Sequence, residues 1–275
     1  MFLPIGVVIG TAVFMWMYYA NHKEESNEQK VIVATGIRMT DLQDMVGKFT
    51  GPIGVRTIEN NQGRTGLRLA ASMIQGRLGP QNLGLKIYSG EGTAAHDRLW
   101  KSLWVDVRGG DKVSEVVIAA VPFTGAGEVA DANTVSTLMM LASSLANEKP
   151  SRTIRLVFLP IDRPQEEQNQ WLLSRCLQEG ELCVGIVGID VMRGSPKPGD
   201  PNWVAAAPNS ADKDWWEFLS SGGKAVKTES DSVPSVWLTH AVYSDNAWVD
   251  RKEQRLEETI NVARQLREWL LKAAS

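Results

Sequence analysis

The chain has two cysteines, Cys176 and Cys183, with six residues between them in the stretch RCLQEGELC. In an exported domain a pair at this spacing can close a short loop as a disulfide, whereas in the cytosol the two would be ordinary thiols. A metal site built on two cysteines needs further ligands. Because the whole chain has only three histidines, we expect no cysteine–histidine metal site.

The histidines also give little support to a serine hydrolase. His240 is a candidate general base, but the sequence lacks the G-x-S-x-G turn that exposes a nucleophilic serine. The glycine-rich stretch FTGAGEV at 123–129 lacks both the G-x-G-x-x-G spacing and the lysine of a phosphate-binding loop. We therefore expect neither a catalytic triad nor a nucleotide site.

Helical and strand-like segments alternate along most of the chain. The run VVIAAV at 116–121 is continuously apolar, which is typical of a strand covered on both faces. Strand–helix alternation predicts an α/β, three-layer αβα fold with a mixed, largely parallel central sheet. Helices are expected at 66–78, 133–147, 166–179 and 251–274, and strands at 116–121, 154–159, 184–189 and 233–239.

The N-terminal segment 2–20 contains nineteen residues without a charge. As a helix it would be about 28 Å long, close to the ~30 Å hydrocarbon core of a bilayer. No Lys or Arg precedes the apolar run, so a cleaved signal peptide fits less well. We expect one transmembrane anchor at 1–21, a polar linker at 22–40 and a single α/β domain at 41–275.

Two further sequence features bear on partners. Gly6 and Gly10 are spaced as G-x-x-x-G, which is a close-packing motif of transmembrane helices but also arises by chance. Ten tryptophans serve either core packing or a contact surface, where Trp is enriched. The net charge of −3 argues against a nucleic-acid partner.

The order of several stretches over residues 41–272 resembles the zinc-dependent aminopeptidase family, which includes glutaminyl cyclase and the ectodomains of the transferrin receptor and nicastrin. The stretches that carry the resemblance are GRTGLRLAASMIQGRL, LGLKI, VVIAAVPF, PSRTIRLVFLPIDR and GIVGIDVMRG, in that order. The resemblance implies a zinc-exopeptidase-like fold for the domain that follows the anchor.

The resemblance also implies that metal ligands are missing. In active members the strand matching VVIAAVPF ends in a His-x-Asp pair, and here those positions hold Val121 and Phe123. Neither side chain offers the N, O or S donor that zinc requires. A Glu-Glu pair of the family, general base and ligand, is matched by Asp162 and Arg163. A guanidinium stays protonated and cannot ligate a metal.

Three candidate ligands remain in this comparison. Asp131 matches the bridging aspartate to within about one position, Asp190 matches a ligand aspartate, and His240 lies near the family's last histidine. Tyr243 or Ser244 fits that last position about as well. The resemblance therefore implies a site without zinc, in which Arg163 pairs with Asp131 or Asp190.

These observations favour a non-catalytic, membrane-anchored member of the family without a cofactor. Such a protein would act as an accessory or scaffold subunit of a larger membrane complex, for example an energy-transducing one. Its partners would be other membrane subunits, contacted through the N-terminal helix and the domain surface, and the bilayer itself. Two alternatives are a residual zinc-dependent aminopeptidase or cyclase activity, and a module that binds a peptide or small ligand.

The orientation of the domain has arguments on both sides. Lys23 and Lys30 follow the anchor and favour a cytoplasmic domain by the positive-inside rule. The family resemblance implies export, and the pair Cys176/Cys183 is compatible with an oxidising compartment. We expect an exported, periplasmic or extracytoplasmic domain.

Overall fold

The computed structural model of the chain describes residues 15–16, 36–95, 98–160, 165–192, 203–206, 233, 235–241 and 252–275. The chain divides into two units, Met1–Val33 and Ala34–Ser275. The expected anchor lies outside the described residues apart from Met15 and Trp16, which are helical, and so does most of the expected linker. Within the residues that are described, no helix is long and apolar enough to cross a membrane.

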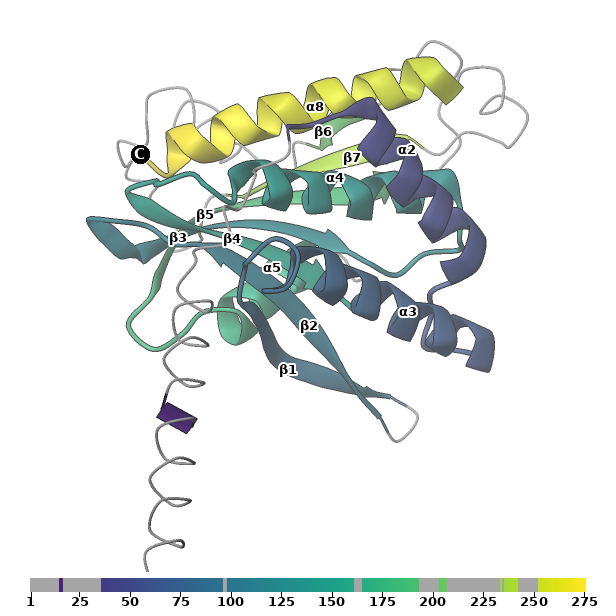
Figure 1. Cartoon of the computed structure of the whole chain (residues 1–275), viewed down its shortest axis with the longest axis horizontal. Helices are drawn as coiled ribbons and strands as arrows, with labels where there is room; N and C mark the ends of the chain where they lie inside the picture. The colour runs from purple at the N-terminus through teal and green to yellow at the C-terminus, as the bar shows by residue number, and fades with distance from the viewer. Residues whose placement is uncertain are drawn as a thin grey trace, which may run out of the picture. The chain divides into compact units, whose positions relative to one another are not determined.

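A seven-stranded mixed sheet runs through the Ala34–Ser275 unit in the order β1-β2-β4-β3-β5-β7-β6 (Figure 1). The inner strands β4, β3, β5 and β7 are parallel, whereas the pairings β1–β2, β2–β4 and β6–β7 are antiparallel. The prediction of a mixed α/β sheet is confirmed, with parallel pairing confined to the inner strands. The bounds are β1 Ile87–Ala95, β2 Arg98–Val107, β3 Lys112–Pro122, β4 Arg152–Leu159, β5 Leu182–Met192, β6 Trp203–Ala206 and β7 Ser235–Ala241.

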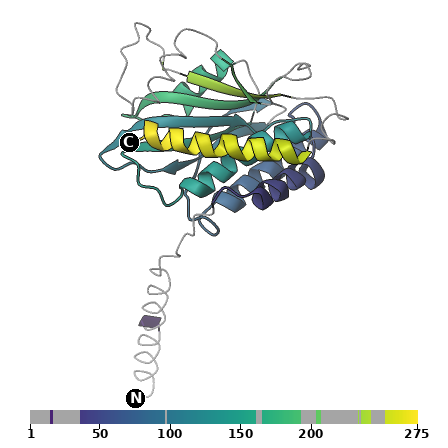
Figure 2. The same cartoon turned by 90° about the horizontal axis from the view of Figure 1, so that it is seen from above.

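Helix α4 is the centre of the helical layer on one face of the sheet (Figure 2). All but two of its 17 residues are buried, because it lies between the strands on one side and α2 and α8 on the other. Burial on every side extends to its polar residues, among them Asn133, Thr134 and Ser143. The helices of this layer are α2 Met39–Lys48, α3 Asn61–Leu78, α4 Val129–Leu145 and α8 Lys252–Ala273, with a short π-helix, η1, at Phe49–Ile53.

Helix α5, Gln165–Arg175, covers the opposite face of the sheet. Its residue Leu172 packs in one cluster with Ile118 of β3, Val157 of β4 and Ile186 of β5. Helices therefore lie on both faces, which gives the three layers that the alternation of elements predicts.

Candidate functional site

The carboxyl ends of the four parallel strands lie at one edge of the sheet, which is where open α/β sheets bind their ligands. At this edge β3 ends at Pro122, β4 at Leu159, β5 at Met192 and β7 at Ala241. All of the positions that the resemblance assigns to metal ligands or to the general base lie in these strand ends or in the segments that follow them. The topology therefore brings the described positions of the expected site to one edge of the sheet.

Two of those positions carry buried apolar side chains. Val121 is fully buried and Phe123 is 2% exposed, so both belong to the core at the end of β3. The backbone of Phe123 is fixed as well, because its N–H donates to the Leu159 carbonyl at 2.8 Å. This end of β3 contributes packing in place of the imidazole and carboxylate that a metal centre needs.

The third position, Asp131, lies in the first turn of α4. One of its carboxylate oxygens, Oδ2, accepts a hydrogen bond of 2.7 Å from the backbone N–H of Ala126. A carboxylate here is also favoured by the positive end of the helix dipole. The contact closes the turn between β3 and α4, so part of the capacity of Asp131 to bind a ligand is already used.

A buried arginine that the sequence reasoning missed, Arg56, lies beside this turn. Its side chain is fully buried, and its guanidinium donates to the carbonyls of Phe123 at 2.9 Å, Gly54 at 2.9 Å and Phe49 at 3.1 Å. It also lies over the Phe49 ring, 5.2 Å from the centroid. Arg56 thus connects the η1 segment to the end of β3.

The positive charge of Arg56 is buried away from solvent. Burial lowers the pKa of Arg56 to about 10, and the nearby negative charge of Asp131 opposes that shift. The guanidinium therefore remains protonated at neutral pH. The sequence offered no signal for this role, since Arg56 lies in an irregular segment between η1 and α3.

The other expected site residues are described only in part. Asp190 lies in β5 opposite Thr239, and His240 lies in β7 opposite Val191, so the two backbones are neighbours across one strand pair. Asp162 and Arg163 lie outside the described residues, as do Tyr243 and Ser244. The ion pair expected for Arg163 stays a prediction.

A pocket of about 480 Å³ opens beside the end of β3. It lies between α3, β1 and β2, and Phe123 forms part of its wall. The described lining residues are Leu67, Arg68, Ala71, Gln75, Ser89, Trp100, Lys101, Leu103 and Phe123. Its volume lies within the range of about 300–1,000 Å³ found for small-ligand sites.

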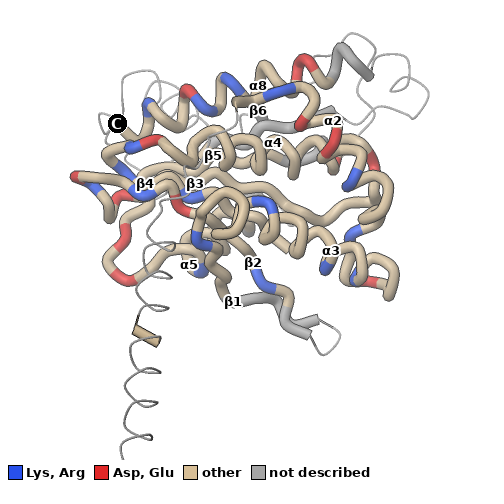
Figure 3. Tube along the Cα trace, viewed as in Figure 1, with Lys and Arg blue, Asp and Glu red and all other residues tan. Residues whose placement is uncertain are grey.

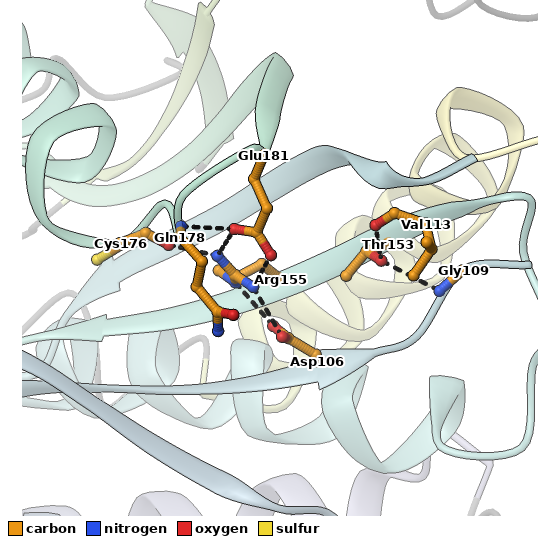
Figure 4. A network of polar contacts seen from close by, with 8 residues as sticks. All are labelled: Asp106, Gly109, Val113, Thr153, Arg155, Cys176, Gln178 and Glu181. Carbon is orange, nitrogen blue, oxygen red and sulfur yellow. Dashed lines mark hydrogen bonds and ion pairs between the residues drawn. The ribbon is translucent and has the colours of Figure 1, made fainter.

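A separate buried ion cluster lies on the α5 face of the sheet (Figure 4). Arg155 of β4 is fully buried and donates from Nε and Nη2 to Asp106 at 2.8 Å each, and from Nη1 and Nη2 to Glu181 at 2.6 and 2.9 Å. Its guanidinium also lies 5.5 Å from the Trp104 ring centroid. Two carboxylates compensate this one buried cation, which fixes β2, β4 and the start of β5 to one another.

The two cysteines are free thiols in the structure, so the disulfide considered from their spacing is not formed. Both side chains are buried in the apolar cluster under α5, and Cys183 donates from its thiol to the Gly185 carbonyl. Burial raises the pKa of Cys176 and that of Cys183 to about 12. Core packing is therefore the role of both residues, and the pair no longer argues for export.

The described donors do not fit a zinc ion. Among the residues whose side chains are described, no group of three or more His, Cys, Asp or Glu could hold a metal; the side chains of Asp162, Asp190 and His240 fall outside that part of the chain. At the edge itself Val121 and Phe123 offer no donor atom, and Asp131 lies beside a guanidinium. Zinc sites in proteins take three or four N, O or S ligands.

The fold of this chain is that of zinc-dependent exopeptidases, aminopeptidases and glutaminyl cyclases, as its sequence resemblance implies. The LapA aminopeptidase of Legionella pneumophila superposes with a TM-score of 0.58 at 13% identity, over 90% of this chain and 75% of that chain. A putative Zn-dependent exopeptidase of Bacteroides vulgatus gives 0.53 at 10% identity, over 89% and 98%. The Porphyromonas gingivalis glutaminyl cyclase gives 0.53 at 13% identity, over 85% and 97%. The sequence matches no protein-family model. It also matches no curated protein.

Proposed function

We propose that this chain is a non-catalytic protein with an aminopeptidase-like domain, held in a membrane by its N-terminal segment as an accessory subunit of a larger membrane complex. The observation that carries the non-catalytic part is the pair Val121 and Phe123. At the end of β3 the resemblance places a His-x-Asp pair whose histidine binds zinc, and here both side chains are packed in the core. A reaction that needs zinc at this edge lacks that ligand.

The accessory role is supported by the fold and the N-terminal sequence together. The domain has about 235 residues and the fold of an enzyme family. Even without catalysis, a domain of this size offers a large surface for protein contacts. The uncharged segment 2–20 is long enough for one membrane span. Within it Gly6 and Gly10 would let a second helix approach closely.

The test is extraction of the tagged full chain in a mild detergent, followed by identification of the proteins that copurify. We expect a stoichiometric membrane partner. A double variant, G6L/G10L, should release a partner that is bound through the span. The matched control I5L/I9L changes two residues with the same spacing and similar volume, so it should retain that partner. A chain that purifies alone as a monomer would contradict the accessory role.

Zinc content separates this proposal from residual peptidase or cyclase activity. We expect less than about 0.1 zinc per chain after purification in zinc-containing buffer, since a closed site needs three or four ligands. Zinc bound at one ion per chain, and lost in the variants D131N and D190N, would favour the enzyme instead.

A second candidate function, ligand binding without chemistry, is favoured by the pocket beside Phe123. Its wall includes Phe123 and Trp100, and its volume is that of a small-ligand site. The two functions are compatible, because an accessory subunit needs a surface that recognises its partner.

A further inference from the structure

The pocket between α3 and β2 has the chemistry of an anion site with an apolar floor. Arg68 of α3 and Lys101 of β2 both line it and both are exposed, so their charges are available to a bound group. None of its described lining residues is acidic. Figure 3 marks basic residues along α3, a helix that has three arginines and no acidic residue.

The polar residues of the lining offer hydrogen-bond donors, although one donor of the wall is buried. Trp100 is 8% exposed, and its indole Nε1 has no hydrogen-bond partner within the described part of the chain. A buried N–H without a partner costs about 1–3 kcal/mol, but this atom has almost no accessible surface and does not open into the pocket. Gln75 and Ser89 are polar residues of the lining, and each side chain has a donor. A ligand rich in acceptors suits this set.

The floor of the pocket selects for an apolar group next to that anion. Leu67, Leu103 and Phe123 are each at most 4% exposed, yet they form part of the wall. An inorganic anion would leave this apolar surface uncovered. A carboxylate attached to an apolar side chain would use both halves of the pocket.

The sheet edge beside the pocket suits an extended chain. Ser89, which lines the pocket, belongs to β1, the terminal strand of the sheet among the described residues. An extended peptide can add to such an edge through main-chain hydrogen bonds while a pocket receives its side chain. This geometry favours a polypeptide end over a fatty acid, which has no main chain to pair.

We propose that this pocket binds the carboxyl-terminal end of a partner polypeptide whose last residue is apolar. The terminal carboxylate lies between Arg68 and Lys101, and the last side chain covers Leu67 and Phe123. This inference deepens the proposed accessory function and rests on it for the identity of the partner as a protein.

The test is fluorescence anisotropy of labelled five-residue peptides ending in Leu or Phe, added to the full chain in detergent. Peptides with a free carboxylate should bind at least about tenfold more tightly than the same peptides ending in a carboxamide, because the carboxamide loses the charged contact with two cations. K101M and R68M should each weaken the free-acid peptide about fivefold or more.

The matched control is K86M. Lys86 is also an exposed lysine beside β1, but it does not line the pocket and lies over the Tyr88 ring instead. K86M should bind the peptide as the unchanged chain does. Equal binding of acid and amide, no detectable binding of either, or equal loss in K86M and K101M would each overturn the proposal.

Two further outcomes separate its parts. The first outcome concerns a lipid ligand. If laurate displaces the peptide, and if a peptide N-methylated in its last three residues binds unchanged, then the pocket binds a lipid carboxylate. That result would overturn the polypeptide assignment. Because the peptide assay uses the purified chain alone, failure to find a copurifying membrane subunit would refute the accessory function without refuting peptide binding. A copurifying membrane subunit together with no peptide binding would refute the peptide site and leave the accessory function standing.

Discussion

The guanidinium of Arg56 and the carboxylate of Asp131 lie on the same side of Gly125. A Cβ atom built on Gly125 would lie 2.5 Å from both Cγ and Oδ2 of Asp131 and 2.6 Å from Nη2 of Arg56. The backbones of Gly125 and Arg56 are also joined by two hydrogen bonds of 2.7 and 2.9 Å. The carboxylate at the position of a bridging ligand is therefore enclosed by a glycine, a backbone amide and a fixed positive charge.

This closeness predicts that G125A is strongly destabilising. The added methyl group would lie within 3.0 Å of two charged side chains that are both held by hydrogen bonds, so one of them must move. Overpacking of this kind costs about 1–3 kcal/mol. Urea unfolding followed by circular dichroism should show the lower midpoint.

The control for this variant is G47A in α2. No atom lies within 4 Å of a Cβ built on Gly47, and the residue is exposed in a helix interior. Alanine there should raise the free energy of unfolding by about 0.5–1 kcal/mol, because it has the higher helix propensity. If G125A proved as stable as the unchanged chain, the packing of Arg56 and Asp131 against Gly125 would be wrong.

The Arg155 cluster predicts a loss of stability in acid. Burial is the largest single influence on Glu181 and acts to raise its pKa. The hydrogen bonds from Arg155 and from the Gln178 N–H, together with the charge of Arg155, outweigh burial. The pKa of Glu181 is therefore lowered below its usual value. A carboxylate with a lowered pKa stabilises the fold above its unfolded-state pKa of about 4.3, and that stability is lost as pH falls through the folded-state pKa.

The variant E181Q tests this sign. At pH 7 it should unfold about 1–3 kcal/mol more easily, because Arg155 loses one charged partner but keeps Asp106. The difference from the unchanged chain should shrink as pH falls below about 4. The exposed pair Lys48–Asp44 provides the control, since D44N should cost less than about 0.5 kcal/mol at either pH. A pH-independent loss in E181Q would contradict the charge argument.

The inner part of the fold could be predicted because most of its residues are apolar. The elements β3, β4, β5 and α4 were all predicted, with starts within four residues of the observed ones and ends within three. Helix α3 begins five residues before the predicted start, because the Asn60 side chain caps it by accepting from the Gly63 N–H at 2.7 Å. Strand β6 was missed, since its four residues carry too short a pattern.

The polar interior could not be predicted, because its partners are far apart in the sequence. Arg155 follows a strand pattern, but its partners Asp106 and Glu181 come from other elements, 49 and 26 residues away. Arg56 contacts the Phe123 carbonyl 67 residues along the chain. Local spacing carries no information on such contacts, and the same limit made Cys176 and Cys183 read as a possible disulfide.

Free thiols in the core predict slow chemical modification. With pKa values raised to about 12 by burial, Cys176 and Cys183 should carry almost no thiolate at pH 8. Iodoacetamide should therefore leave both unmodified in the folded chain, and should modify two thiols per chain in urea. Mass spectrometry of the intact protein counts the added groups. If the chain unfolded in urea without reductant shows no reactive thiol, the two cysteines form a disulfide instead.

Restoring the missing His-x-Asp pair should not restore a zinc site. The double variant V121H/F123D places an imidazole and a carboxylate where the structure has a packed apolar core, and it should lower the free energy of unfolding by about 3–5 kcal/mol. Zinc should not raise its unfolding midpoint, because the sequence still has Arg163 at a further ligand position. The apolar control V121I/F123L should cost less than about 1.5 kcal/mol and should also be insensitive to zinc. A zinc-dependent rise in the midpoint of V121H/F123D alone would mean that Asp131 and the remaining edge residues still form a metal centre, and it would refute the reading of this edge as a site that has lost its metal.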